Sequence, residues 1–128
     1  MMQLLTGNAL LGMEKSMSFL WAKQSAILDN ISNAETPGYK TKFVTFEEEL
    51  REKLQNAGKN AAPRAAIRQT LENADWTVHE ADESTRMDEN SVNVTEQSLE
   101  MVRTAYQLQY TMQSISSDLQ TLRTAITG

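Results

Sequence analysis

Apolar side chains recur alternately three and four residues apart near the start of the chain. This is the a/d spacing of a helix that packs along one face against another helix. It predicts an amphipathic helix over residues 9–35. Leu11, Trp21 and Leu28 lie off the seam and widen the apolar stripe, so we expect more than one partner surface. The seam comprises Leu10, Met13, Met17, Leu20, Gln24, Ile27, Ile31 and Ala34, of which only Gln24 is polar.

The same periodicity returns near the end of the chain, where it is cleaner. It predicts a second long helix that starts at Val94, with Asn93 and Glu96 as a capping pair. This seam comprises Val94, Ser98, Met101, Ala105, Leu108, Met112, Ile115, Leu119, Leu122 and Ile126, of which only Ser98 is polar.

Two such seams predict a mainly α fold in which the terminal helices pack as an antiparallel, coiled-coil-like pair. Residues 1–40 and 91–128 then form a terminal helical domain, and residues 41–90 a small irregular middle segment. A two-helix core is marginal for a chain of 128 residues. We therefore expect the helices to complete their burial against other subunits, and the helix ends of an isolated chain to become ordered on assembly.

The sequence of the middle segment predicts one short helix and at most two short strands. Thr45 and Glu48 have capping-box spacing, with Thr45 as the N-cap of a helix to about Asn56. Residues 56–66 have the small-residue, Gly and Pro content of a flexible linker. Trp76 and Val78 alternate with polar neighbours, as in a short strand.

A helix stop closes the first helix. Pro37 lacks an amide proton and moves Thr36 out of the α region, while Gly38 can adopt a positive φ. Two roles remain open, a local helix stop in which Asn33 caps carbonyls, and a contact with a neighbouring subunit. The candidate residues for both roles are Asn30, Asn33, Ala34, Thr36, Pro37, Gly38 and Tyr39.

The net charge of −5 and the absence of Lys/Arg clusters argue against nucleic-acid binding, which needs a basic patch. The chain has no cysteine, which excludes thiol catalysis and cysteine metal sites. Charged residues such as Glu14, Lys15 and Lys23 make the first 35 residues too polar to span a bilayer. No basic region precedes the first apolar residues, so we expect no cleavable secretory signal.

No catalytic, metal or cofactor site can be assembled from the sequence. His79 is the single histidine, and we expect it to be a polar surface residue. The consecutive carboxylates Glu47, Glu48 and Glu49 point in different directions on a helix, which favours a solvated face over catalysis. Tyr106 and Tyr110 share a face off the main seam, where they pack either on a neighbour or on the first helix.

The stretch from Asn30 to Lys40 resembles the N-terminal signature of bacterial flagellar axial proteins, the rod, hook and hook-associated family. The usual form is Asn-Ile-Ala-Asn-Ala-Asp/Asn-Thr-Pro-Gly-Tyr, from which Ser32 and Glu35 differ. Residues 86–93 resemble the Arg-x-Asp-Gly-Asn-x-Val-Asp stretch of proximal-rod subunits of the B type, with Glu89 and Asn93 as departures. The short chain and the ending from Leu122 to Gly128 also resemble that group.

The resemblance implies a structural subunit of the flagellar basal body, outside the cytoplasmic membrane. Such subunits leave the cell through the flagellar type III export gate without a cleaved signal. Their implied partners are further copies, other rod subunits and the membrane-ring and export-gate end of the basal body. The implied role is to transmit torque from the motor to the hook, with no cofactor, nucleic acid or small-molecule substrate.

Two other functions compete with this interpretation. A helical export chaperone or adaptor would also be small, acidic and free of cysteine, but it would stay in the cytoplasm as a soluble dimer with its cargo. The helix stop at Pro37 and Gly38 favours the rod subunit over this alternative. An enzyme would need a catalytic constellation, and the sequence offers none.

Overall fold

The computed structural model describes residues 7–81 and 90–128, and the fold is mainly helical. Two long terminal helices pack against each other, and two shorter helices and a two-stranded antiparallel sheet lie between them in the sequence. The elements are α2 (Asn8–Ser32), β1 (Lys42–Thr45), α3 (Glu47–Gly58), α4 (Pro63–Glu72), β2 (Thr77–Glu80) and α5 (Val94–Thr127).

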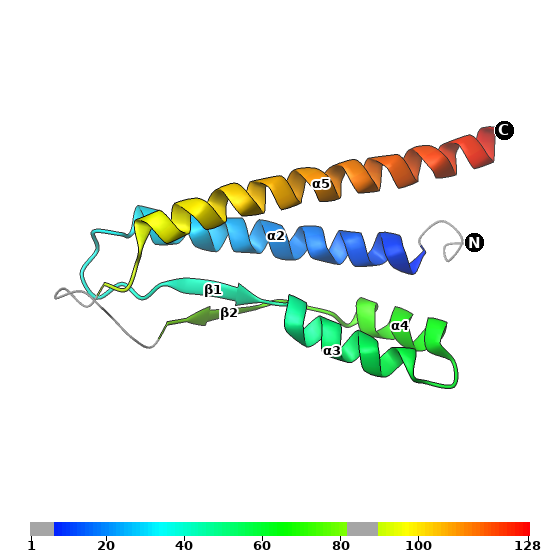
Figure 1. The fold of residues 1–128 in the computed structure, drawn as a ribbon, viewed down its shortest axis with the longest axis horizontal. Coiled ribbons are helices and arrows are strands. Elements are labelled where there is room, and N and C mark those ends of the chain that lie inside the picture. The colour runs from blue at the N-terminus through cyan, green and yellow to red at the C-terminus, as the bar shows by residue number, and fades with distance from the viewer. Residues whose placement is uncertain (1–6, 82–89) are drawn as a thin grey trace.

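Helices α2 and α5 run antiparallel, with the end of α2 beside the start of α5 (Figure 1). This confirms the predicted helical pair. The cap of α5 is also as predicted, because the Asn93 side chain accepts a hydrogen bond from the Glu96 amide at 3.2 Å. That bond satisfies one of the backbone donors that a helix N-terminus leaves free.

The middle segment lies along α2 on the side opposite α5 (Figure 1). The two strands run beside the C-terminal half of α2, and the α3–α4 hairpin runs beside its N-terminal half. Helix α2 is therefore the central element of three layers.

A second stripe of α2 residues, distinct from the a/d seam, holds this third layer. Asn8 donates to the Arg64 carbonyl at 3.2 Å, and Lys15 donates to the Glu72 and Ala74 carbonyls at 3.3 Å. The Phe19 ring stacks on Phe46 with centroids 5.1 Å apart. Gly12 faces the same layer, since a Cβ there would lie 3.8 Å from Leu71 Cδ2, an ordinary van der Waals distance. The stripe comprises Asn8, Gly12, Lys15, Phe19 and Asn30, spaced three, four or more residues apart on one face.

A small core joins the three layers. Phe19 and Leu20 of α2, Phe46 and Leu108 are each at least 93% buried and form one cluster. Trp76 packs against its edge, and its indole N–H donates to the Ser18 hydroxyl at 3.3 Å. Few aromatic side chains are needed to fill this core, because the layers it joins are thin.

Within residues 41–81 the two strands agree with the prediction of at most two short strands. They pair in antiparallel register, with Phe43 opposite His79 and Val44 opposite Val78. His79, which was expected to be a polar surface residue, is half-buried. Its ring stacks on Phe43, and its Nε2 lies 2.7 Å from the Thr45 hydroxyl.

Two predictions for the middle segment are wrong. Thr45 does not cap α3, because it is the last residue of β1 and Phe46 occupies the N-cap position. The predicted linker at residues 56–66 is mostly helical, since α3 continues to Gly58 and α4 begins at Pro63. Pro63 starts that helix because its fixed φ suits the first turn and its missing N–H costs nothing there. A second middle helix therefore replaces the linker, and only residues 59–62 connect the two.

Candidate assembly surfaces

Asn30 forms the centre of the helix stop and is completely buried. Its Nδ2 donates to the Lys42 carbonyl and to Gln97 Oε1, both at 2.8 Å. Its Oδ1 accepts from the Lys42 amide at 2.8 Å and from the Tyr39 hydroxyl at 3.1 Å. A buried amide is stable only when its donors and acceptors are paired, and Asn30 meets that condition within its own chain.

Asn33 caps the end of α2, as the local interpretation predicts. Its Nδ2 donates to the Asp29 carbonyl at 2.8 Å, and its Oδ1 accepts from the Thr36 hydroxyl at 3.1 Å. Gly38 follows with φ of +75°, the positive value that was expected of it. The side chains of Asn30 and Asn33 thus act locally, whereas Thr36, Pro37 and Gly38 are exposed. A contact of these exposed residues with a neighbour stays a prediction.

Asn90 completes the turn from the far end of the chain, and sequence reasoning did not single it out. This side chain is completely buried and donates to the Asn33 carbonyl at 2.8 Å and the Thr36 carbonyl at 2.7 Å. Its Oδ1 accepts from the Val92 amide at 2.9 Å. Residues 86–89 of the same stretch lie outside the described residues, so the interpretation of that part of the stretch has no structural counterpart.

Tyr39 links the end of α2 to the segment that precedes α5. Its hydroxyl donates to Asn30, and its carbonyl accepts from the Ser91 amide at 3.1 Å. Partial burial raises the pKa of Tyr39 above 10.0, and the nearby carboxylates of Asp29 and Glu80 raise the pKa further. The protonated hydroxyl, which can donate, is therefore the form that the fold favours.

The predicted seam of α2 is covered along its length. Leu20, Ile27 and Ala34 are buried, and the other seam positions are half-buried. The seam of α5 is divided. Met101, Leu108, Ile115 and Leu122 are buried or half-buried, whereas Val94, Ala105, Met112, Leu119 and Ile126 are exposed.

Polar side chains take the inner positions that these exposed residues leave. Gln97, Thr104, Thr111 and Asp118 are buried or half-buried. The packed face of α5 is therefore rotated away from the centre of its apolar stripe. Half of the α5 seam therefore faces outward in the isolated chain.

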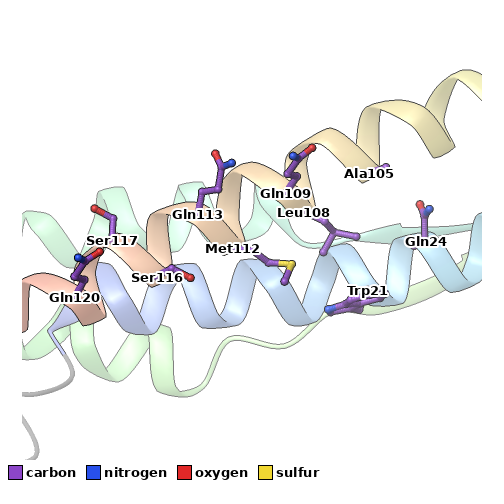
Figure 2. Close-up of a pocket in the computed structure, with 10 residues that line it drawn as sticks. All are labelled: Trp21, Gln24, Ala105, Leu108, Gln109, Met112, Gln113, Ser116, Ser117 and Gln120. Carbon is purple, nitrogen blue, oxygen red and sulfur yellow. The ribbon is translucent and has the colours of Figure 1, made fainter. Parts of the chain in front are cut away.

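A groove runs along this outward half, between α2 and α5. Its volume is about 690 Å³, and Trp21, Ala105, Leu108 and Met112 form its apolar part. Trp21 is 57% exposed and Met112 51% exposed. Figure 2 shows Met112 pointing toward α2, whereas Gln109 and Gln113 point away from it. Glutamine and serine side chains, including Gln24, form the rest of the lining.

A second apolar stripe lies on the outer face of α5. It comprises Leu99, Val102, Tyr106 and Tyr110, spaced three and then four residues apart and 66%, 51%, 68% and 73% exposed. At 3.6 residues per turn, Tyr106 and Tyr110 each lie about 160° around the helix from Leu108. The outer stripe is therefore largely exposed, although Tyr106 and Tyr110 also line a hollow with Ser16 and Leu20 of α2. Sequence reasoning identified only its two tyrosines, and whether they pack on a neighbour or on the first helix stays a prediction.

The same part of α5 is free of charge. Residues 104–117 contain no Asp, Glu, Lys or Arg, and Arg103 and Asp118 bound this uncharged segment. Charged and polar side chains normally cover the solvent face of a helix, and in this segment uncharged glutamine, serine and threonine side chains are the polar residues. In the isolated chain, however, α5 touches protein mainly on one side.

Other kinds of site are not apparent in the described part of the chain. No three His, Cys, Asp or Glu side chains within residues 7–81 and 90–128 are grouped as metal ligands. No helix among the described residues combines the length and the apolarity that a membrane crossing requires.

Comparison with known proteins does not assign the chain to a family. No protein-family model matches the chain, and no curated protein matches it either.

Proposed function

We propose that this chain is a structural subunit of the bacterial flagellar rod, in its proximal part and of the B type. The observation that carries the proposal is the uncharged surface of α5, which exposes apolar side chains on two sides. The sequence from Asn30 to Lys40 adds the resemblance to flagellar axial proteins.

The exposed surface of α5 supports an assembling subunit in physical terms. Monomeric soluble proteins rarely leave large contiguous apolar patches in water. Here two apolar surfaces are exposed, the outer stripe on α5 and the Trp21–Met112 groove between α2 and α5, and α5 has no charged side chain between residues 104 and 117. Burial against neighbouring subunits would remove this surface from water, at about 25 cal/mol per Å² of apolar area.

The resemblance suggests where the subunit acts in the cell and how it is exported. As a rod subunit, the chain passes through the flagellar type III export gate and assembles with further copies, other rod subunits and the membrane-ring end of the basal body. There it forms part of the shaft that transmits torque to the hook.

An export chaperone or adaptor is the second candidate, because a groove between two helices also suits a cargo helix. The location of the protein distinguishes the two. A rod subunit stays in purified basal bodies after the cytoplasmic fraction is removed, whereas a chaperone stays with its cargo in the cytosol.

The test is to purify basal bodies from the native cell and to quantify this chain by mass spectrometry. We expect it at a fixed ratio to the membrane-ring protein, and we expect a cytosolic marker protein to be absent. Recovery of the chain only as a cytosolic complex with an exported protein would overturn the proposal.

A further inference from the structure

We propose that α5 has two alternative packing faces, and that the helix turns about its own axis by about 50° to exchange one face for the other. In the structure α5 packs its polar face against α2, and the turned arrangement places its apolar face there. Shifts of a helix between discrete packed arrangements are an established kind of conformational change in proteins. The inference goes beyond the proposed function, since it concerns a single chain in solution and needs no second subunit.

Three rows of side chains run along α5, and each row repeats every seven residues. The inner row is common to both faces and comprises Met101, Leu108, Ile115 and Leu122. The polar row beside it is buried or half-buried and comprises Gln97, Thr104, Thr111 and Asp118. The apolar row on its other side is exposed and comprises Ala105, Met112, Leu119 and Ile126. At 3.6 residues per turn, both flanking rows lie about 40–60° from the inner row, so a turn of about 50° replaces one by the other.

The polar side of α5 packs with buried acceptors that lack partners. Thr104 is completely buried, and its Oγ1 has no hydrogen-bond partner among the described residues. Gln107, on the same side of Leu108, has a buried Oε1 that also lacks a partner in the described part of the chain. A buried polar group without a hydrogen bond is destabilising, and Met112 and Leu119, both 51% exposed, forgo apolar burial. From Thr104 onward, both effects favour the turned arrangement.

Two contacts near the start of α5 hold the helix in the observed arrangement, and we call them the latch. Gln97 Oε1 accepts a hydrogen bond from Asn30 Nδ2 at 2.8 Å, and Lys23 Nζ lies 3.3 Å from Glu100 Oε2. Asn30 is completely buried, and the Lys23 and Glu100 side chains are only 26% and 29% exposed. A turn of about 50° displaces the end of a side chain by about 5 Å, because a helix with its side chains has a radius of about 5–6 Å. Neither contact can persist after such a displacement.

The turn closes the Trp21–Met112 groove. It moves Ala105 and Met112 toward Trp21 of α2, which is 57% exposed, and it carries Thr104 toward water. Figure 2 shows Met112 already pointing toward α2. No charge enters the interface, because residues 104–117 contain no Asp, Glu, Lys or Arg. The apolar row is therefore covered by α2 of the same chain, and the groove is open only while the latch is closed.

Thiol labelling of single-cysteine variants tests the turn, because the parent chain has no cysteine. Thr104→Cys reports on the polar row, and Ala105→Cys, one residue later, reports on the apolar row. Position 104 is completely buried and position 105 is exposed. With the latch intact in dilute protein, we expect a maleimide to label position 105 at least about tenfold faster than position 104, since a buried thiol reacts only when the structure opens.

Removal of the latch should reverse this order. Each cysteine variant is combined with Gln97→Ala and Glu100→Ala, since alanine preserves the helix. We expect labelling to become at least about fivefold faster at position 104 and about fivefold slower at position 105. Arg103→Ala is the matched control, because it removes an ion pair with Glu100 within α5 and leaves the latch in place, so the parent order should remain.

Two other results of latch removal would overturn the inference. Faster labelling at both positions would show that α5 separates from α2 instead of turning on it. Unchanged labelling at both positions would show that α5 has a single packing face.

A second set of variants tests the apolar row. Met112→Gln and Leu119→Gln are added together to the chain that lacks the latch. The observed arrangement leaves both side chains half-exposed and loses little, whereas the turned arrangement loses their burial. We therefore expect the labelling order of the parent to return, and persistence of the reversed order would contradict the inference. All of these measurements are independent of whether the chain is found in basal bodies, so the proposed function is tested separately.

Discussion

Asn30 connects three segments that are distant in the sequence, namely the end of α2, the start of β1 and the first turn of α5. It does so through Lys42, Gln97 and Tyr39, from a position without solvent exposure. A hydrogen bond contributes modestly when made, but a buried partner left without one costs far more. The side chain thus fixes how the three layers meet.

Asn30→Ala should therefore lower the free energy of unfolding by about 3 kcal/mol, since it removes the partner of half-buried polar groups of Lys42 and Gln97. Asn33→Ala is the matched control, because its cap to the Asp29 carbonyl is exposed and its loss should cost about 1 kcal/mol. Urea unfolding of both variants measures the difference. Equal losses would show that the Asn30 network is not important for stability.

The raised pKa of Tyr39 makes the fold sensitive to alkaline pH. The folded-state pKa exceeds the unfolded value of about 10. Its contribution to stability is therefore complete below that value and is lost as the pH rises through the folded-state pKa. We expect Tyr39→Phe to be less stable than the parent at pH 8 and to lose less stability than the parent between pH 9 and pH 12. Urea midpoints across this range give the result, and parallel curves would contradict it.

At the scale of elements, α5 differs from α2 because only α2 is covered on two sides. Thr104 and Leu108 of α5 are buried against α2, whereas Leu119 and Ile126 are 51% and 69% exposed. A helix gains most of its stability from packing an apolar face, and the later half of α5 packs little of it.

In dilute protein, the protection of backbone amides from hydrogen exchange should therefore decrease along α5 toward its C-terminal end. We expect the strongest protection around Thr104 and Leu108 and weak protection from Met112 onward. Assembly should extend protection toward Thr127, since neighbours then cover the exposed faces. Full protection of residues 95–126 in the dilute monomer would refute this prediction.

At the scale of the whole molecule, the helix stop places α5 and the middle segment on opposite sides of α2. Gly38 holds a φ of +75°, and no atom lies within 4 Å of where its Cβ would be. A valine there suffers backbone strain alone, of about 1–2 kcal/mol. The strain falls on the turn that sets the angle between the layers.

Gly38→Val and Pro37→Ala should accordingly leave export intact but impair incorporation into the rod. Secreted amounts of each variant measure export, and swarming on soft agar with basal-body yield measures assembly. Gly58→Ala, at the end of α3, is the control and should behave as the parent. Normal motility in both turn variants would remove the case for a role of the turn in assembly.

The sequence by itself determined the elements with strong local signals. The heptad spacing predicted both long helices, Asn93 and Glu96 predicted the cap of α5, and Trp76 and Val78 predicted a strand. Pro37 and Gly38 predicted the turn because proline and glycine restrict or free the backbone locally. Resemblance to the axial proteins came from the same stretch and remains a matter of sequence.

Only the tertiary structure decided which face of each helix is covered. Counting apolar residues could not show that Gly12, Lys15 and Asn30 belong to a second packing stripe, because their partners lie in the middle segment. It missed Asn90 and Gln97 for the same reason, since a polar residue is recognised as structural only through distant partners. Thr45 and the linker were misassigned because strand pairing and docking on α2 outweighed local preference. The rotation of α5, which leaves Met112 and Tyr106 in water, follows from how three layers fit together and cannot be read from one helix alone.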